Sequence, residues 1–293
     1  MGNARKRADA DAVLDSVRHH YARMSALADA VRRDEPDAVH QMRVASRRLR
    51  SVLGTYDSVF PPETTTPVRS ELRWLGTVLG RARDEEVLAD RFRSALDAQP
   101  PELIRGPVRH RLVDAHRGDY RAAHAEAVAV LDEPRYRDLV AALGGLCAEP
   151  RPSGQGSVAK SLRKAYRRLD KAGRDAGLRG PTAPGGQAPP ELVHAVRKRA
   201  KALRYAGEAV TASRPKAVRV ASAAENLQTV LGEHQDATVA RQHLLAAADR
   251  ARGAGEDTFT YGLLTAAEAA DAQQSGARAR DGLRAVRKRK RDL

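Results

Sequence analysis

Residues 40–50 read HQMRVASRRLR, and residues 194–204 read HAVRKRAKALR. Both stretches follow the pattern H-x-x-R-x-x-x-[R/K]-x-L-R. On a helix that advances about 100° per residue, the basic side chains of the first stretch fall within an arc of about 80°. Its apolar side chains fall on the opposite side. The pattern predicts two amphipathic helices with one cationic face each, formed by His40, Arg43, Arg47 and Arg50 in the first and by His194, Arg197, Lys201 and Arg204 in the second.

Neither stretch contains an acidic residue. A solvated helix face normally mixes charges, because like charges at i,i+4 repel each other by a few tenths of a kcal/mol. Leaving out the acids in both stretches indicates that a ligand supplies the negative charge. Guanidinium groups grip two phosphate oxygens at once, and lysine acts as a point charge, so a linear phosphate chain suits such a row.

The composition points to the same class of partner. The 293 residues include 52 Lys+Arg and 37 Asp+Glu, a net charge of +15, which predicts a polyanionic ligand. Cys147 is the single cysteine, so no internal disulfide can form, and we expect a reducing compartment such as the cytoplasm. No apolar run approaches 18 residues, so we expect no membrane-spanning helix and no membrane partner.

The whole chain reads as helical, with Pro and Gly clusters as punctuation. Pro61-Pro62 and Pro100-Pro101 end two helices, and residues 177–190 form a Pro/Gly-rich loop. Asp84 and Asp236 each follow a Leu-Gly pair, which favours helix N-caps; the alternative is that each carboxylate orients a nearby arginine. No sustained period-2 run is present, so the fold class is predicted to be all-α.

Several short matches recur in the same order along the chain. His40 and His194 lie 154 positions apart, and TVLG at residues 77–80 recurs 152 positions later. The pattern S-x-R-x-x-Y recurs at an interval of 145, which pairs Arg18 with Arg163. Ordered matches of this kind predict two copies of one helical unit. We expect two antiparallel bundles with pseudo-twofold symmetry that brings the basic faces together on a central surface or pore.

The expected boundaries follow from these matches. The repeat halves are about 9–147 and 158–290, joined by a linker at 148–157 and preceded by a tail at 1–8. Residues 287–291 are expected to be a solvated basic tail.

VHQMRVASRRLRSVL, LRWLGTVLGRARDEEVL, the second basic helix ending in KALRY, and LQTVLGEHQD together resemble the CHAD domain, the conserved histidine α-helical domain. The resemblance covers about residues 9–290. It implies two similar helical bundles that hold inorganic polyphosphate on a basic central surface or pore. The acidic ExExK signature of the CYTH-type domain that often accompanies this family does not occur, so a stand-alone CHAD protein is expected. The second motif departs slightly, with Lys201 where the first has Arg47 and Ala202 where it has Arg48.

For the two histidines, direct phosphate contact and a structural hydrogen bond both remain open. Metal binding is disfavoured, because the flanking cations repel an ion and no H-x-x-x-H pair is present. A protonated imidazole next to polyphosphate would be stabilised, so affinity is expected to rise from pH 8 to pH 6 and to lose this rise in a His40→Gln, His194→Gln variant. The complete predicted polyphosphate site comprises Arg18, His40, Arg43, Arg47, Arg48, Arg50, Arg163, Arg167, His194, Arg197, Lys198, Lys201 and Arg204.

The leading functional interpretation is therefore electrostatic polyphosphate binding without a cofactor, with targeting to polyphosphate granules as a further expectation. Nonspecific nucleic-acid binding is the first alternative, although aromatic residues make up only 4% of the chain and single-strand binders rely on aromatic stacking. An enzyme of polyphosphate metabolism is the second. Phosphoryl transfer needs metal-binding acids or a phosphohistidine with a partner base, and no acidic cluster or Walker-type loop accompanies the motifs, so we expect no enzyme.

Overall fold

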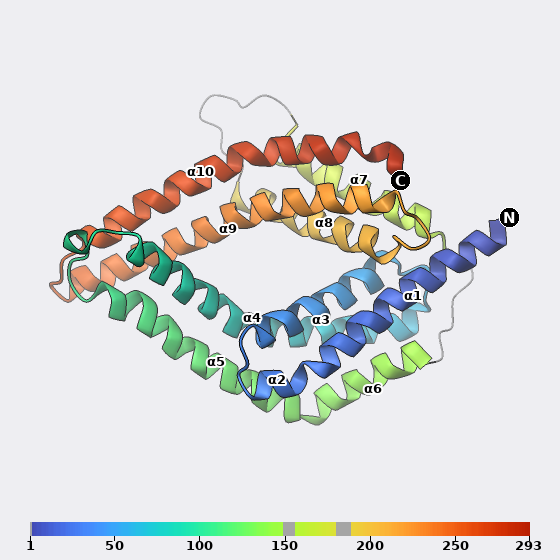
Figure 1. Ribbon diagram of the computed structural model, residues 1–293, viewed down its shortest axis with the longest axis horizontal. Coiled ribbons are helices and arrows are strands. Elements are labelled where there is room, and N and C mark those ends of the chain that lie inside the picture. Colours follow the sequence, from blue (N-terminus) through green and yellow to red (C-terminus); the bar gives the residue numbers. More distant parts are fainter. Residues whose placement is uncertain (1, 149–155, 180–188) are drawn as a thin grey trace.

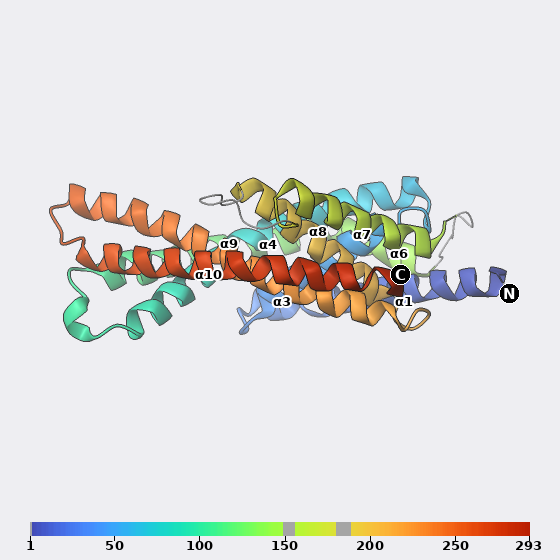
Figure 2. The same cartoon turned by 90° about the horizontal axis from the view of Figure 1, so that it is seen from above.

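The computed structural model describes residues 2–148, 156–179 and 189–293, and within these ranges it is helical with no β-strand. The all-α prediction is confirmed. Figures 1 and 2 show an elongated molecule in which the helices of the first and second halves lie side by side. The first half contains α1 (Gly2–Ala26), α2 (Ala28–Arg32), α3 (Ala38–Thr55), α4 (Pro62–Asp97), the 3-10 turn η1 (Pro101–Leu103), the π-helical turn η2 (His110–Asp114), α5 (Ala115–Asp132) and α6 (Pro134–Ala148). The second half contains α7 (Val158–Asp175), α8 (Pro190–Ala209), α9 (Ala217–Gly253), α10 (Phe259–Lys288) and the 3-10 turn η3 (Lys290–Asp292).

Helix α4 passes through the position where the sequence predicted a break. It continues unbroken through Gly80 and Asp84, and α9 continues through Gly232 and Asp236. The N-cap interpretation of the two aspartates is therefore wrong. A glycine inside a helix costs about 1 kcal/mol relative to alanine. The apolar side chains buried on both sides of Gly80, from Leu79 to Leu88, carry the helix across it.

The chain termini and loops also differ from the expected boundaries. Helix α1 begins at Gly2, so the residues expected to form a tail at 1–8 are helical from position 2. Residues 287–291 are exposed as expected, but Arg287 and Lys288 lie in the last turn of α10 rather than in a tail. Most of the linker expected at 148–157, and most of the loop expected at 177–190, lie outside the described residues.

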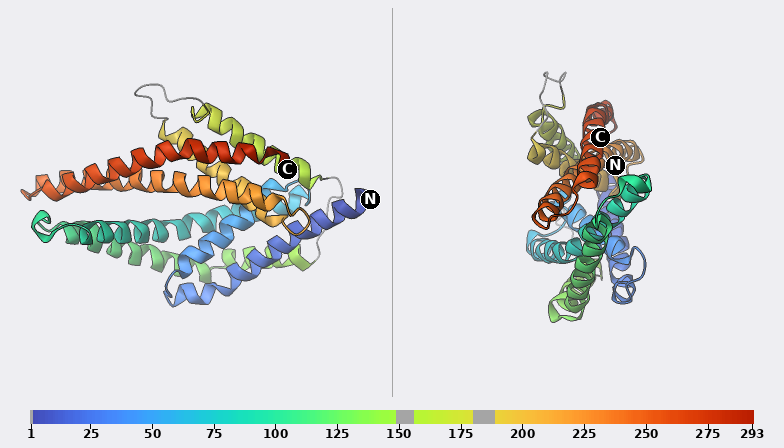
Figure 3. Two further views of the ribbon diagram at one scale, coloured as in Figure 1. Left: turned by 45° about the horizontal axis from the view of Figure 1, so that its top comes forward. Right: turned by 90° about the vertical axis from the view of Figure 1, so that its left-hand side faces the viewer.

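Two apolar clusters hold the helices together. The larger cluster joins both halves, with Leu49 and Leu79 from the first and Leu203 and Leu227 from the second. Figure 3 shows the far ends of α4 and α5 lying beside those of α9 and α10. The smaller cluster lies in these ends, where the Phe92 and Leu244 side chains are fully buried. No helix in the described ranges is both long enough and apolar enough to cross a bilayer.

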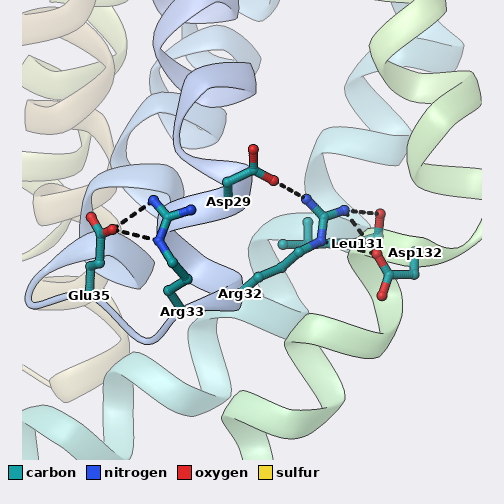
Figure 4. Close-up of polar contacts among 6 residues, drawn as sticks. All are labelled: Asp29, Arg32, Arg33, Glu35, Leu131 and Asp132. Atoms are coloured by element: carbon teal, nitrogen blue, oxygen red, sulfur yellow. Dashed lines mark hydrogen bonds and ion pairs between the residues drawn. The ribbon is translucent and has the colours of Figure 1, made fainter.

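At the contact between α2 and the end of α5, arginines with a structural role are neutralised by neighbouring acids. Arg32 in α2 donates from Nε to Asp132 Oδ1 at 3.0 Å, from Nη2 to the Leu131 carbonyl at 3.1 Å, and from Nη1 to Asp29 Oδ1 at 2.7 Å (Figure 4). Arg33 donates to Glu35 nearby. Each guanidinium therefore has an acid beside it, and Arg32 joins α2 to the end of α5.

Candidate functional site: a cation cluster between α3 and α8

The two motif helices pack against each other. On α3 the apolar side chains of Met42, Ala45, Leu49 and Val52 are buried as their spacing predicts. This leaves Arg43 and Arg47 on a face near α8. Burial is the main cause that lowers the pKa of Arg197 and of Lys201, and the nearby charges of Arg47 and Arg43 lower both further. The structure therefore gathers cations from the two motifs into one central cation cluster, comprising Arg43, Arg47, Arg50, Arg197 and Lys201.

A pocket of 380 Å³ opens where α3 faces α4. Arg43, Arg47 and Arg50 line it from α3, and Gly76 and Gly80 are among the α4 residues that line it. Side-chain-free positions on α4 leave room for long side chains from α3. The pocket is thus a cationic recess with a small-residue wall.

Arg43 and Arg197 occupy matching places in the two halves. Arg43 lies over Gly80, where an added Cβ would come within 3.2 Å of its Nη2, and its Nη1 donates to Asp84 Oδ1 at 3.0 Å. Arg197 lies over Gly232 at 3.5 Å in the same sense, with Asp236 Oδ1 at 3.9 Å from its Nη2. Each aspartate thus accompanies an arginine from the middle of a helix, which was the alternative role considered for it. The internal duplication itself stays a prediction.

Three cluster members have no acid of their own. Among the described residues, Arg47, Arg50 and Lys201 form no ion pair, and Arg47 Nε is buried without a hydrogen-bond partner. Burial first, and then the charges of Arg197, Arg47 and Arg43, lower the pKa of Lys201 to about 7. Burial and the neighbouring arginines also lower the pKa of Arg50. The cluster therefore holds uncompensated positive charge at an energetic cost, which an anion would relieve.

The two motif histidines lie beside the cluster, and the pKa of each is lowered. Burial, and next the charge of Arg83, lower the pKa of His40. Burial, and next Lys198, lower the pKa of His194, although its hydrogen bond to Gln235 acts in the opposite direction. Neutral imidazoles can donate one hydrogen bond each without adding charge. Their contact with a phosphate stays a prediction.

Two other motif arginines have a different role. Arg48 Nη1 donates to Glu208 Oε2 at 2.5 Å, and its guanidinium stacks 4.7 Å from the centre of the Tyr205 ring. Arg204 Nε donates to Glu208 Oε1 at 2.7 Å, and its Nη2 contacts Glu225 at 2.8 Å. Glu208 follows the second motif by four residues and lies outside the stretch that predicted an acid-free face. Arg48 and Arg204 thus form a bridging pair that joins α3 to α8, with their charge already neutralised.

The remaining predicted contacts are spread over other surfaces. Arg18 donates from Nε and Nη2 to the Cys147 carbonyl at 3.1 and 2.9 Å, which ties α1 to α6. Lys198 is exposed on α8. Arg163 and Arg167 line a different pocket at the outer side of the second half. The structure therefore separates the predicted residues into the central cluster, the bridging pair and more distant groups.

One group of metal-ligating side chains escaped the sequence analysis. Glu85 on α4 and His116 and Asp119 on α5 place ligand atoms within 4.8 Å of one another, and the His243 ring lies 5.2 Å from that of His116. His116 Nδ1 is hydrogen-bonded to Glu85 Oε2 at 2.5 Å. Within the described residues this is the one such group, and His40 and His194 are not part of it. His116 and Asp119 lie three positions apart on α5, but Glu85 comes from α4, so only the fold brings all three together.

Comparisons with known proteins agree on the family. The CHAD domain profile matches residues 15–245. Two curated Mycobacterium tuberculosis proteins, uncharacterized proteins MT2285 and Rv2226, are each 46% identical over 242 residues, which is 82% of this chain. The chain spans 46% of the length of each.

Two solved structures share the fold. PptA from Streptomyces chartreusis superposes with a TM-score of 0.76 at 20% identity, covering 94% of this chain and 99% of that one. The CHAD domain from the plant Ricinus communis superposes with a TM-score of 0.69 at 27% identity, covering 94% of this chain and 91% of that one. With the family profile matched over most of its length, this chain belongs to the CHAD domain family.

Proposed function

We propose that the chain binds inorganic polyphosphate through the central cation cluster. The observation that carries this proposal is the meeting of two basic motifs at the α3–α8 contact, where Arg47, Arg50 and Lys201 have no acid partner among the described residues. The CHAD family is linked to polyphosphate binding, which supports the same ligand.

The proposed mechanism is electrostatic. Phosphates displace water and counterions from the cluster, so affinity falls as salt rises. Arg43 and Arg197 are held in place by their aspartates and present their remaining donors to phosphate oxygens, whereas Arg47, Arg50 and Lys201 supply uncompensated charge. His40 and His194 add hydrogen bonds at the margins. Arg48 and Arg204 contribute to the fold rather than to the ligand.

We propose binding without catalysis. The acids that touch the cluster, Asp84 and Asp236, accompany arginines and are not arranged as a metal site. Pure protein incubated with long-chain polyphosphate and Mg²⁺ is expected to release no phosphate. Continuous release that scales with protein concentration would replace this proposal with an enzymatic one.

A competition experiment tests the ligand. Labelled long-chain polyphosphate is bound at physiological salt and challenged with tripolyphosphate or duplex DNA, each at matched phosphate concentration. We expect long polyphosphate to compete far better than either, because a chain can occupy several cluster members at once while a duplex is too wide for the recess. Equal competition by DNA per phosphate would favour the alternative of a nonspecific nucleic-acid-binding surface.

The cellular counterpart of this proposal is a cytoplasmic protein that gathers at polyphosphate granules. A fluorescent fusion of the chain is expected to coincide with granules in cells that accumulate polyphosphate. A fusion carrying Arg47→Gln and Lys201→Gln is expected to spread through the cytoplasm. Equal granule recruitment of both fusions would contradict this expectation.

A further inference from the structure

The seam between α7 and α10 contains a second pocket, which we call the outer pocket. Its volume is 540 Å³, within the range of small-molecule sites. It shares no lining residue with the pocket beside α3. Six of its lining side chains are basic: Arg163, Arg167, Arg174, Arg179, Arg287 and Lys290.

One acid, Asp170, is shared by three of these six cations. Asp170 lies 3.3 Å from Arg174 Nη1, 3.1 Å from Arg179 Nη2 and 3.5 Å from Arg287 Nε. A single carboxylate cannot neutralise three guanidiniums. In the described part of the chain, Arg167 and Lys290 form no ion pair at all. The outer pocket therefore carries a large excess of positive charge.

The corresponding seam in the first half is built without this charge. It lies between α1 and α6, where Arg18 donates to the Cys147 carbonyl, whereas Arg163 Nε in the second half donates to the main-chain oxygen of Leu293 at 3.2 Å. The positions 145 residues before Arg167, Asp170 and Arg174 are Ala22 and Ser25 in α1 and Asp29 in α2, so none of them is basic.

The helix on the other side of the first seam also lacks basic residues over most of its length. After Arg137, helix α6 has no Lys or Arg through its last residue, whereas Arg287 on α10 and Lys290 just beyond it line the outer pocket. Two helices can therefore pack along this seam without the basic residues. Their presence in one half only indicates a binding role rather than a packing role.

We propose that the outer pocket is a second anion site that takes a short run of adjacent phosphate groups. Several guanidiniums around one recess can grip neighbouring phosphates with paired hydrogen bonds. The class of ligand in this inference rests on the proposed function, whereas the location of the site rests on the residues that line the outer pocket. The run of phosphates comes either from the end of a polyphosphate chain or from a separate small polyphosphorylated molecule.

Calorimetric titration with tripolyphosphate tests the site. The key variant is Arg167→Gln, Lys290→Gln, because these two cations have no ion pair whose loss would disturb the fold. The matched control is Lys164→Gln, Arg168→Gln, which removes the same charge from exposed positions of α7 outside the pocket. We expect two equivalents of tripolyphosphate on the parent and control, and one on the outer-pocket variant, with equal melting temperatures. An outer-pocket variant that binds like the control would overturn the proposal.

A second arm identifies the source of the phosphates and separates the two proposals. If long-chain polyphosphate binds the outer-pocket variant several-fold more weakly than the control, one chain reaches both sites; equal affinity assigns the pocket to a separate small ligand. Either result supports an anion site in the outer pocket, provided that the outer-pocket variant binds one tripolyphosphate fewer than the parent. If the parent binds neither ligand, the proposed function itself fails. If Arg47→Gln, Lys201→Gln abolishes all binding while the outer-pocket variant matches the control, only the outer pocket fails.

Discussion

Arg47 and Lys201 belong to the same two motifs as Arg48 and Arg204, yet the two pairs lie in opposite electrostatic surroundings. The bridging pair, Arg48 and Arg204, shares the carboxylate of Glu208. Arg47 and Lys201 have no acid partner among the described residues, and the pKa of Lys201 is lowered to about 7. One short pattern thus supplies both the cations that fasten α3 to α8 and the cations left for a ligand.

The difference teaches that charge alone does not identify a binding residue. A guanidinium satisfied by a carboxylate gains little from an added phosphate, whereas one that is held near other cations gains both attraction and relief from repulsion. Burial sharpens the contrast, because interactions in a recess are screened less than those on the surface.

The largest expected effect is on affinity. Arg47→Gln, Lys201→Gln should weaken long-chain polyphosphate binding by about a hundredfold at physiological salt, if each charge-assisted contact contributes about 1.5 kcal/mol. Fluorescence titration of the variant against Lys164→Gln, Arg168→Gln measures this, since the control loses the same formal charge. If the variant lost no more affinity for polyphosphate than the control, the central cation cluster would bind no better than any exposed basic surface.

Glu208 provides the opposite case, a strong effect on stability with little on affinity. Glu208→Gln should lower the free energy of unfolding by about 1–2 kcal/mol, because two mostly buried guanidiniums lose a shared carboxylate. Urea unfolding checks this. Glu225→Gln is the control, since Glu225 touches Arg204 as well but its side chain is 45% exposed, and less than 0.5 kcal/mol is expected, as for roughly any surface pair. Equal losses in both variants would show that Glu208 is not special.

The low pKa of Lys201 makes binding depend on pH. Its ammonium is largely protonated at pH 6 and largely neutral at pH 8, since burial and the charges of Arg197, Arg47 and Arg43 outweigh that of Asp236. Affinity for polyphosphate should therefore fall several-fold, and by at most about tenfold per pH unit for one linked proton, between pH 6 and pH 8. Lys201→Arg should flatten the profile. The His40→Gln, His194→Gln variant should keep most of it, because both histidine pKa values are already lowered. If the histidine variant flattened the pH profile and Lys201→Arg did not, the pH dependence would come from the imidazoles rather than from Lys201.

The same group should affect stability with a defined sign. Because the folded pKa of Lys201, about 7, lies below its usual value of 10.5, the unfolded chain binds more protons between these pH values. Stability contributed by this group therefore rises from pH 7 to about 10.5. Lys201→Met should raise the free energy of unfolding at pH 7 by about 1 kcal/mol and by less at pH 10. Equal gains at both pH values would indicate a packing effect.

The smallest expected effect concerns the position of the Arg43 guanidinium over Gly80. An alanine at position 80 brings its Cβ within 3.2 Å of Arg43 Nη2, so Gly80→Ala should displace the guanidinium and weaken polyphosphate binding about two- to threefold. Gly262→Ala is the matched control, because Gly262 lies on α10 outside the recess and an added Cβ there meets nothing within 4 Å. The control should bind normally and gain about 0.5–1 kcal/mol of stability from helix propensity. Equally weakened binding in the control would show that the loss at position 80 does not come from displacing Arg43.

Much of the fold follows from spacing in the sequence. The buried face of α3, including Met42 and Leu49, follows from helical periodicity, and the all-α class follows from the absence of period-2 runs. The helix ends were harder to predict. Gly80 and Gly232 resemble helix terminators, but burial on both sides carries α4 and α9 through them.

The composition of the site was predicted less completely, for a physical reason. An ion pair between Arg48 and Glu208 joins residues 160 positions apart, so only the fold brings the acid to the motif. The i,i+4 spacing of Arg204 and Glu208 was the one local signal that could have shown part of this bridge. The grouping of Glu85 with His116 leaves no such signal, because the two residues come from different helices.

The salt dependence of polyphosphate binding tests the central claim most directly. In a plot of log affinity against log salt concentration, removing two phosphate-neutralising cations should reduce the slope by about 1.4, taking about 0.7 per phosphate as for single-stranded polyanions. We predict this reduction for Arg47→Gln, Lys201→Gln and an unchanged slope for Lys164→Gln, Arg168→Gln. A central-cluster variant whose slope equals that of the parent would mean that these cations do not neutralise the ligand, which would contradict the account.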